Sequence, residues 1–440
     1  PLNLRSARLQ RNLTLFEAIM IGLGPTIGPT IFVVPRLAVE MAGPAAILTF
    51  ILAGVLSVFI ALNYATMSSR VTKAGGGYSF VSYAFGGVPA FLSGWFMYIG
   101  NVAYGALSAC TAAISVSHIV PIPAVEIAAL LLALFTLLNL FGVKKASGAQ
   151  VILMSLVVVV LLLFVVVGVF KLDASRFEPF TPFGYRPVFL TLGYVFSIYV
   201  GFELITNVSE EVKRAHKIVP RAIIATIVIA LILFPTILAV MLGIIDQTSI
   251  VSSEAPLVSA AFNLSPLFGL LMVFSSIIAS LGSLNAAVIA SSRTLYSLSR
   301  DEHIPKVFES IHPSFRTPHI ALLFTFILTL LLISLFQIEL LVYVSDLGYL
   351  LGLTLINPAG FFIKKKGGNH SISNKLIPTL ALISTLMILP TINRNAILIG
   401  LILTTIGFTL AVIEKLFKTK RSEKGAEKKK VWRRSLVDEV

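Results

Sequence analysis

Residues 22–30 read Gly-Leu-Gly-Pro-Thr-Ile-Gly-Pro-Thr, and they lie inside an apolar stretch that runs from near Leu13 past Pro35. Its glycines and prolines oppose an ordinary helix, because each proline lacks an N–H donor and clashes with the turn before it. Within a membrane, such a break leaves costly unpaired backbone groups, which are tolerated only against protein or a water-filled cavity. We therefore predict a discontinuous helix that lines a binding site near the membrane midplane; a simple proline kink is the alternative.

The rest of the chain is as apolar as a membrane location requires. Of the 440 residues, 57% are hydrophobic and only 12% are charged, whereas a soluble protein of this length carries more charge. The segment Val151–Val169 contains no charged residue and has the length that crosses a bilayer core as a helix. The first apolar stretch is too long for the core of a signal peptide, so we expect it to remain as a membrane span.

Turn residues and charges divide the chain into twelve predicted spans. We predict a ten-helix transport core over residues 14–363 and two additional helices over residues 376–414. A cytoplasmic N-terminal segment, residues 1–13, precedes them, and a basic cytoplasmic tail, residues 415–440, follows them. We expect the tail to be disordered or to lie at the lipid surface. The spans are placed at about 14–42, 44–67, 88–117, 123–142, 148–170, 187–208, 220–243, 265–298, 319–337, 339–363, 376–392 and 396–414.

The basic residues are distributed unequally between the two sides of this arrangement. Of the 34 lysines and arginines, 29 fall on one side and 5 on the other. The positive-inside rule then places both termini in the cytoplasm of a multi-pass protein of the cell membrane. The formal net charge of +14 does not indicate a nucleic-acid partner, because the charges lie between apolar spans; membrane lipids are the expected surroundings.

The sixth span carries a second irregular segment. Residues 193–203 read Gly-Tyr-Val-Phe-Ser-Ile-Tyr-Val-Gly-Phe-Glu, which places a serine, a glycine and a carboxylate at mid-depth. Spans one and six each begin a set of five helices. Because five crossings are an odd number, the second set enters the membrane from the side opposite to the first. We therefore predict an all-α membrane protein with a five-plus-five inverted repeat, in which discontinuous helices 1 and 6 face each other. Their freed amides and carbonyls suit the two opposite charges of an amino acid.

Several motifs occur at matching depths along the chain, and together they resemble those of the amino acid–polyamine–organocation (APC) superfamily of transporters over about residues 12–362. They are the Gly-x-x-Ile-Gly core that ends at Gly28, Ala42-Gly-Pro-Ala45, Ala74-Gly-Gly-Gly-Tyr78, Gly201-Phe-Glu203, Glu210-Glu-Val-Lys213, Val219-Pro-Arg-Ala222, Ser283-Leu-Asn-Ala286, Ser292-Arg-Thr-Leu-Tyr296 and Arg316-Thr-Pro318.

The resemblance implies that the break in span one holds the substrate carboxylate and that carbonyls of spans one and six hold the amine. By position, the implied substrate-binding residues are Thr26, Ile27, Gly28, Pro29, Thr30, Ser197, Ile198 and Val200. The superfamily usually has Gly-Ser-Gly or Gly-Thr-Gly after the isoleucine, whereas this chain has Gly28-Pro29-Thr30. Proline removes one amide donor, which the hydroxyls of Thr26 and Thr30 can replace. Span five lacks the lysine that some proton-coupled relatives carry there.

Ionisable and polar residues within spans are functional candidates, because burying them is costly. Glu203 is the first candidate for coupling or gating, with a structural hydrogen bond as its alternative. Asp346 is the second candidate, unless it lies near a helix end.

Other polar and aromatic residues within the spans have a functional and a structural interpretation. Asn101 and Tyr104 can contact a substrate side chain or bridge helices. Phe196, Tyr199 and Phe202 are candidate gates, with aromatic packing as the alternative. We expect Glu17 and Glu40 to cap a helix or to face the membrane interface. We expect the side chain of Arg36 to extend toward the interface, and Cys110 to be a packing residue.

Other classes of function find less support in the sequence. No histidine pair has metal-ligand spacing, no phosphate-binding loop predicts ATP drive, and no catalytic cluster lies in the spans, so neither a cofactor nor an enzyme is expected. A channel usually needs a symmetric ring of filter residues. We therefore expect a secondary transporter, a symporter or antiporter of amino acids or organic amines, with a proton or sodium as coupling ion. An inorganic cation or cation-chloride carrier of the same fold is the alternative.

Overall fold

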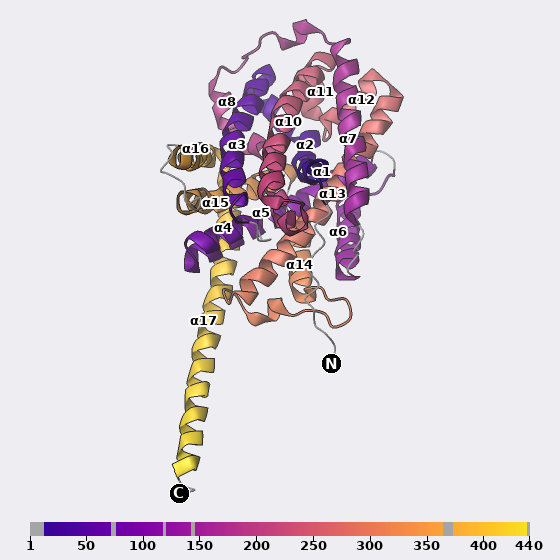
Figure 1. Ribbon diagram of the computed structural model, residues 1–440. Helices are drawn as coiled ribbons and strands as arrows, with labels where there is room; N and C mark the ends of the chain where they lie inside the picture. The colour runs from indigo at the N-terminus through magenta and orange to yellow at the C-terminus, as the bar shows by residue number, and fades with distance from the viewer. Residues whose placement is uncertain are drawn as a thin grey trace.

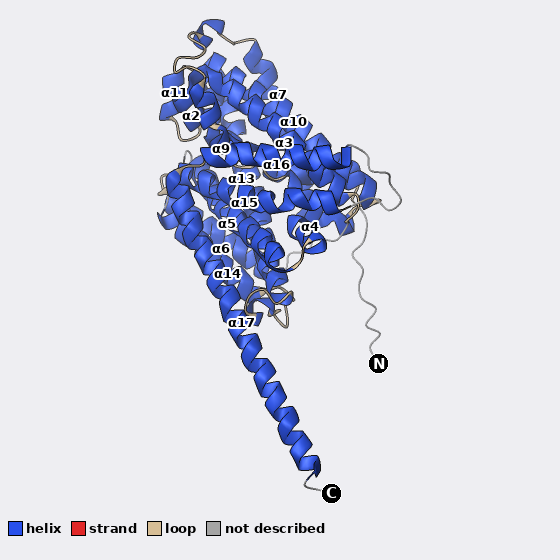
Figure 2. Ribbon diagram, turned by 90° about the vertical axis from the view of Figure 1, so that its left-hand side faces the viewer, coloured by secondary structure: helices blue, strands red, loops and turns tan. Residues whose placement is uncertain are grey.

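The computed structural model describes residues 13–71, 76–117, 120–141, 146–335, 337–363 and 373–437. Within these ranges the chain is helical, with no strand and with one isolated parallel β-bridge, between Leu13 and Val212 (Figure 2). The predicted all-helical class is confirmed. The N-terminal segment expected over 1–13 lies outside the described residues except for Leu13, as do the basic turns at 144–145 and 364–366.

The helices follow the order of the predicted spans. The α-helices are α1 Leu15–Ile27, α2 Thr30–Ala42, α3 Ala46–Ser68, α4 Gly76–Ala84, α5 Gly87–Ser117, α6 Ala124–Phe141, α7 Ala146–Val169, α8 Arg186–Leu190, α9 Leu192–Val195, α10 Ala215–Ile244, α11 Gln247–Ser252, α12 Pro256–Leu264, α13 Pro266–Arg300, α14 His319–Leu335, α15 Ile338–Phe362, α16 Ser373–Ile388 and α17 Arg394–Val437 (Figure 1). The 3₁₀ segments are η1 Gly43–Ala45, η2 Ala174–Phe177, η3 Phe196–Tyr199, η4 Phe202–Glu211, η5 Lys306–Glu309 and η6 Leu389–Thr391.

Eight helices among the described residues are long and apolar enough to cross a membrane. Four shorter apolar helices accompany them, at Leu15–Ile27, Leu192–Thr206, His319–Ser334 and Lys375–Thr391. A multi-pass membrane protein is therefore confirmed in outline. The count of twelve crossings, the inverted repeat and the cytoplasmic position of the termini stay predictions.

Helix α5 lies at the centre of the bundle and packs most extensively against α13 and α15. Small residues allow these close approaches: a Cβ atom on Gly348 of α15 would collide with the backbone of Gly100 of α5, and one on Gly105 would lie 3.3 Å from Ala287 Cβ of α13. Such contacts are typical of helix packing within membranes. Apolar side chains on the outside of the bundle, such as Leu130 and Ile152, are 70% and 72% exposed, as lipid-facing positions require.

The two C-terminal helices pack on the side of the preceding bundle. Helix α16 lies against α3 and α15, and α17 lies against α15 and α5, where Trp95 Nε1 donates a hydrogen bond to the Leu403 carbonyl at 3.0 Å. Beyond this contact α17 projects far from the bundle (Figure 1). The tail, expected to be disordered or to lie at the lipid surface, is not disordered but continues this helix to Val437, because its lysine, glutamate and arginine residues favour helix. Its position at the lipid surface stays a prediction.

Candidate functional site

The break in the first span occurs at Gly28-Pro29. Helix α1 ends at Ile27 with a final bond from Gly28 N to the Gly24 carbonyl at 2.9 Å, and α2 begins at Thr30. Gly28 has φ +36° and ψ −148°, a conformation that is essentially open only to glycine. A Cβ atom there would also collide with the Tyr104 hydroxyl and lie 2.9 Å from Ser283 Oγ. The break is therefore a fixed interruption rather than a kink.

The break in the sixth span occurs at Val200-Gly201. The chain leaves η3 at Tyr199, Val200 is extended, Gly201 has φ +121°, and η4 begins at Phe202. The freed amide of Gly201 donates a hydrogen bond to Glu203 Oε2 at 2.8 Å. The carboxylate thus satisfies a backbone donor that the interruption leaves without a helical partner.

The two interruptions touch each other in the interior. A Cβ atom on Gly201 would lie 2.6 Å from Thr26 N and 2.7 Å from the Pro25 carbonyl carbon, so backbone packs directly against backbone. Tyr104 of α5 donates a hydrogen bond to the Pro25 carbonyl oxygen. A carbonyl within the interrupted region of α1 is therefore held by a tyrosine hydroxyl from a neighbouring helix.

Several buried polar atoms beside this contact have no hydrogen-bond partner among the described residues. They are Thr30 Oγ1, Tyr64 Oη, Glu203 Oε1, Ser283 Oγ and both carboxylate oxygens of Asp346. Asp346 faces the backbone amide of Ser197, but without hydrogen-bond geometry. Most buried polar groups are paired, so these unpaired acceptors and hydroxyls could bind a ligand, a proton or water.

The predicted substrate-binding residues are brought to the same region, but their side chains differ in what they can offer. Thr26 Oγ1 donates to the Gly22 carbonyl at 2.8 Å and Ser197 Oγ donates to the Tyr194 carbonyl at 2.9 Å. Their hydroxyls are therefore engaged within their own helices. Thr30 keeps a free hydroxyl, so of the two threonines expected to replace a lost amide donor only Thr30 is available. Ile27, Ile198 and Val200 are buried.

Asn101 joins two helices. Its Nδ2 donates to the Met97 carbonyl at 2.8 Å, and its Oδ1 accepts a hydrogen bond from Tyr349 of α15 at 3.0 Å. The alternative that Asn101 bridges helices therefore has a direct structural basis. Contact with a substrate side chain stays a prediction.

The three candidate gating aromatics have different neighbours. Tyr199 donates to the Phe50 carbonyl of α3 at 2.7 Å, and its ring centroid lies 5.6 Å from that of Phe234 on α10. Phe202 makes an edge contact with Tyr64 at 5.9 Å, and Phe196 is buried. Tyr199 thus anchors the interrupted helix to its scaffold, whereas Phe202 lies beside the unpaired Tyr64 hydroxyl.

Three tyrosines complete the surroundings of Glu203, and of these the sequence singled out only Tyr104. The Glu203 carboxylate lies within electrostatic range of the hydroxyls of Tyr64, Tyr104 and Tyr349, which come from α3, α5 and α15. A tyrosine in an apolar helix is a signal in the sequence, but the sequence does not say which helices meet. No group of three or more metal-ligating side chains gathers in the described part of the chain.

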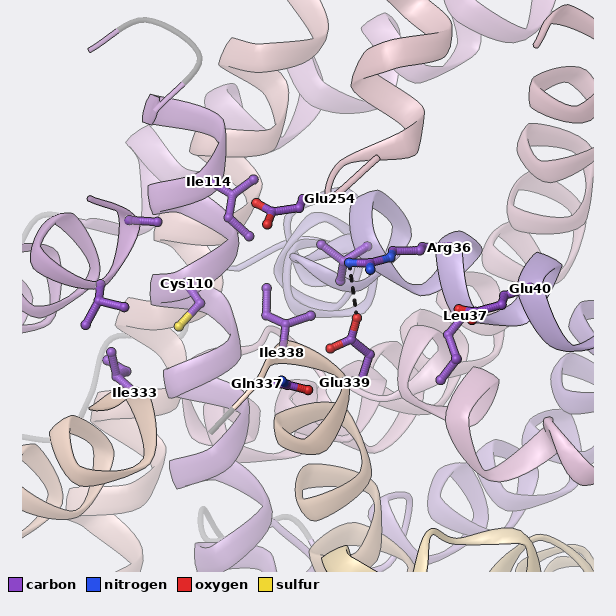
Figure 3. A pocket seen from close by; sticks show the side chains of 13 residues that line it. Arg36, Leu37, Glu40, Cys110, Ile114, Glu254, Ile333, Gln337, Ile338 and Glu339 are labelled. Carbon is purple, nitrogen blue, oxygen red and sulfur yellow. Dashed lines mark ion pairs between the residues drawn. The ribbon is translucent and has the colours of Figure 1, made fainter. Parts of the chain in front are cut away.

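A cavity of about 520 Å³ lies one turn beyond the first break. It is bounded by α2, α5, α6, α14 and α15 and by the loop before α12 (Figure 3). Within it, Arg36 Nη1 pairs with Glu339 Oε1 at 3.3 Å, so this side chain joins α2 to α15. The expectation that Arg36 extends toward the interface stays a prediction. The lining residues are Val33, Arg36, Leu37, Glu40, Cys110, Ile114, Ala124, Val125, Glu254, Ile333, Gln337, Ile338 and Glu339.

Comparison with known proteins identifies the relatives of this chain. It is 28% identical to the methylthioribose transporter of Bacillus subtilis (strain 168), over 86% of this chain and 87% of that protein. It is 26% identical to the branched-chain amino acid permease BcaP of the same strain, over 94% of each. It is 29% identical to the chloroplastic cationic amino acid transporter 9 of Arabidopsis thaliana, over 70% of this chain and 58% of that protein.

A family model described as amino acid permease matches residues 13–413, which includes both helix interruptions. This match confirms the resemblance to the APC superfamily that the motifs indicated, and it assigns the chain to a group of transporters rather than enzymes. The chain therefore belongs to the amino acid permease family.

Proposed function

We propose that the chain is a secondary transporter that moves an amino acid or a related organic amine across the cell membrane by alternating access. The observation that carries this proposal is the contact of the two helix interruptions, at which Gly201 lies against the backbone of Pro25 and Thr26. Interrupted helices that meet in the interior offer amides and carbonyls to a small polar solute. Membership of the amino acid permease family supports an amino acid as that solute.

The roles of the site residues follow from the ends of the interrupted helices. Helix α2 begins at Thr30 without a side-chain cap, so its first amides and the free Thr30 hydroxyl are donors for a carboxylate. The extended residue Val200 and the residues before it supply carbonyls for an ammonium group. Glu203 and Asp346, with their unpaired oxygens, are the groups that exchange a proton or hold a sodium ion during the cycle.

A second candidate is an inorganic cation carrier of the same fold. The unpaired oxygens of Glu203 and Asp346 favour it, because carboxylates are ligands for hard cations. The amino acid permease relatives favour the first candidate. The two differ in the solute that accumulates, so one experiment separates them.

The experiment measures uptake into proteoliposomes that contain the purified full-length chain. The panel consists of neutral and cationic amino acids, a polyamine and rubidium, each offered under a proton gradient, a sodium gradient and no gradient. We expect an amino acid or amine to accumulate against its gradient or to exchange with internal solute. Rubidium uptake alone would favour the cation carrier, and passive ion flow without accumulation or exchange would contradict both.

A glycine substitution tests whether the uptake depends on the first break. In Gly28→Ala, the added methyl group meets the Tyr104 hydroxyl and a strained backbone, and we expect uptake to fall by roughly tenfold or more, because small misplacements in a site are costly. Gly282→Ala on α13 is the matched control, since an added Cβ there meets nothing within 4 Å. Equal uptake in the two variants would remove the Gly28 break from the transport site.

A further inference from the structure

The cavity beyond the first break has the size and the apolar walls of a small-molecule site. Its volume of about 520 Å³ falls within the roughly 300–1,000 Å³ of ligand pockets. Its walls include Val33 of α2, Ile114 of α5 and the neighbouring side chains Ile333 and Ile338. These side chains can receive an aliphatic group.

The cavity also presents a guanidinium that has more donors than its one ion pair uses. Arg36 Nη1 pairs with Glu339 Oε1 at 3.3 Å, and the Arg36 side chain keeps 36% of its surface exposed. A guanidinium carries five N–H donors and recognises a carboxylate with two parallel bonds. The geometry at Arg36 therefore suits an incoming carboxylate.

Negative charge surrounds the same space. Glu254, in the loop between α11 and α12, and Glu40 on α2 line the cavity and make no ion pair among the described residues. Figure 3 shows Arg36, Glu254 and Glu339 gathered at the middle of the cavity, with Cys110 on the α5 side. The lining thus carries one cationic group and three carboxylates, which favours an ammonium group beside the carboxylate that Arg36 receives.

We propose that this cavity is a second binding site for the zwitterion of an aliphatic α-amino acid, separate from the site at the helix interruptions. Arg36 binds the carboxylate, Glu254 binds the ammonium group, and Val33, Ile114 and Ile338 contact the side chain. The proposal rests on the proposed function for its class of solute. Arg36 lies six residues beyond Thr30 on α2, so at 1.5 Å per residue the two sites are about 9 Å apart along the helix.

Other solutes fit the lining less well. A bare inorganic cation leaves the apolar walls without contacts and places positive charge beside Arg36. A polyamine places further positive charge beside Arg36, and a simple carboxylic acid places negative charge beside Glu254. The α-amino acid satisfies all three parts of the lining at once.

The chain carries a natural reporter at this place, because Cys110 is its single cysteine and it lines the cavity. The test measures the rate at which a small methanethiosulfonate reagent modifies Cys110 in the reconstituted full-length protein. Leucine is compared with 3-methylbutylamine, which lacks the carboxylate, and 4-methylpentanoate, which lacks the amine. We expect leucine to slow the modification and each partial analogue to protect at concentrations roughly tenfold higher or more, since each loses a charged hydrogen bond.

Variants assign the protection to the proposed residues. Arg36→Gln and Glu254→Gln should raise the half-protecting leucine concentration by roughly tenfold or more. Glu178→Gln, at a carboxylate outside the cavity, should leave it unchanged. Arg36→Lys keeps the positive charge without the planar guanidinium, so it should weaken protection less than Arg36→Gln. Gel filtration of each variant shows whether it is folded, and Arg36→Lys serves as the test variant if Arg36→Gln is not.

Gly28→Ala separates this proposal from the proposed function. We expect this variant to lose uptake and to keep leucine protection of Cys110. If Gly28→Ala loses leucine protection of Cys110 together with uptake, both readouts depend on one site, and the proposal of a second site is overturned. If the wild type takes up solute but leucine does not protect Cys110, or if Cys110 does not react, the second site is overturned and the assignment as a transporter is unaffected. Protection without uptake of any panel solute by the wild type would support the cavity and reject the transporter.

Discussion

At the scale of single residues, Glu203 combines a structural bond with an unused oxygen. Its Oε2 accepts the hydrogen bond from Gly201 N at 2.8 Å, while Oε1 has no partner among the described residues. The sequence marked this residue because a carboxylate in an apolar span is costly. It did not show that one oxygen is already committed to the interrupted backbone, because that contact depends on the conformation of Gly201.

The different roles of the two Glu203 oxygens give a prediction for Glu203→Gln. The amide oxygen of glutamine can still accept the bond from Gly201 N, but the side chain no longer gains or loses a proton. We expect uptake to continue with a flattened dependence on pH. The pH profile of uptake in proteoliposomes measures this, with Glu178→Gln as the control. A profile identical to that of the wild type would remove Glu203 from proton coupling.

The two threonines at the first break show where residue patterns stop being informative. Thr26 and Thr30 looked equivalent as replacements for the amide that Pro29 lacks. In the structure Thr26 Oγ1 bonds back to Gly22, as threonines within helices often do, whereas Thr30 opens a new helix and has no carbonyl four residues before it in helical position. The difference depends on where the helix ends.

At the scale of elements, the positions of both interruptions and the expectation that they face each other came from the sequence, whereas the residues that make the contact did not. Glycine and proline mark the break in the first span, and Gly201 marks the second. The packing of Gly201 on Pro25 and the bond from Tyr104 to the Pro25 carbonyl join segments far apart in the sequence. Periodicity and turn residues carry no information about such pairings.

The short helix α11 supports α2 from the side, and its cap gives a prediction with a definite pH dependence. Side-chain hydrogen bonds from Ser249 and Thr248 to the carboxylate lower the pKa of Asp246 from its ordinary value of 3.8 to about 2. The ionised carboxylate is therefore favoured in the folded state. Its stabilising contribution is present above pH 3.8 and is lost as the pH falls toward about 2.

Replacing this cap should loosen α11 without unfolding the bundle. We expect Asp246→Ala to cost about 1 kcal/mol locally, which corresponds to roughly fivefold faster hydrogen exchange of the α11 amides. Asp246→Asn should keep most of the protection, because asparagine also caps helices, but should lose its dependence on acid. Unchanged exchange in Asp246→Ala would show that packing on α2 alone holds α11.

At the scale of the whole molecule, composition predicted a helical membrane bundle and motifs predicted the family. The long course of α17 was not predicted, since the charged tail offers no apolar face to signal a helix. The pairing of Arg36 with Glu339 was also not predicted, because it depends on how α2 and α15 lie in the bundle. The second miss concerns a partner that only the assembled helices reveal.

The charge distribution predicts the orientation of the molecule. If both termini are cytoplasmic, trypsin should cleave the basic tail after residue 415 in inside-out vesicles and spare it in right-side-out vesicles. The opposite pattern should hold for the loop that contains Lys171, Arg176 and Arg186. Immunoblotting of tagged fragments measures both cuts. Cleavage of the tail only in right-side-out vesicles would invert the orientation.

The parallel bridge between Leu13 and Val212 has a mechanical consequence. The amide of Lys213 donates to the Leu13 carbonyl at 3.0 Å, so the residues just before α1 and just after η4 are joined by a main-chain hydrogen bond that does not depend on side-chain identity. A rearrangement that carries both segments together keeps this tie, whereas one that parts them must first break it. We therefore expect the two interrupted helices to move in concert at this end of the protein.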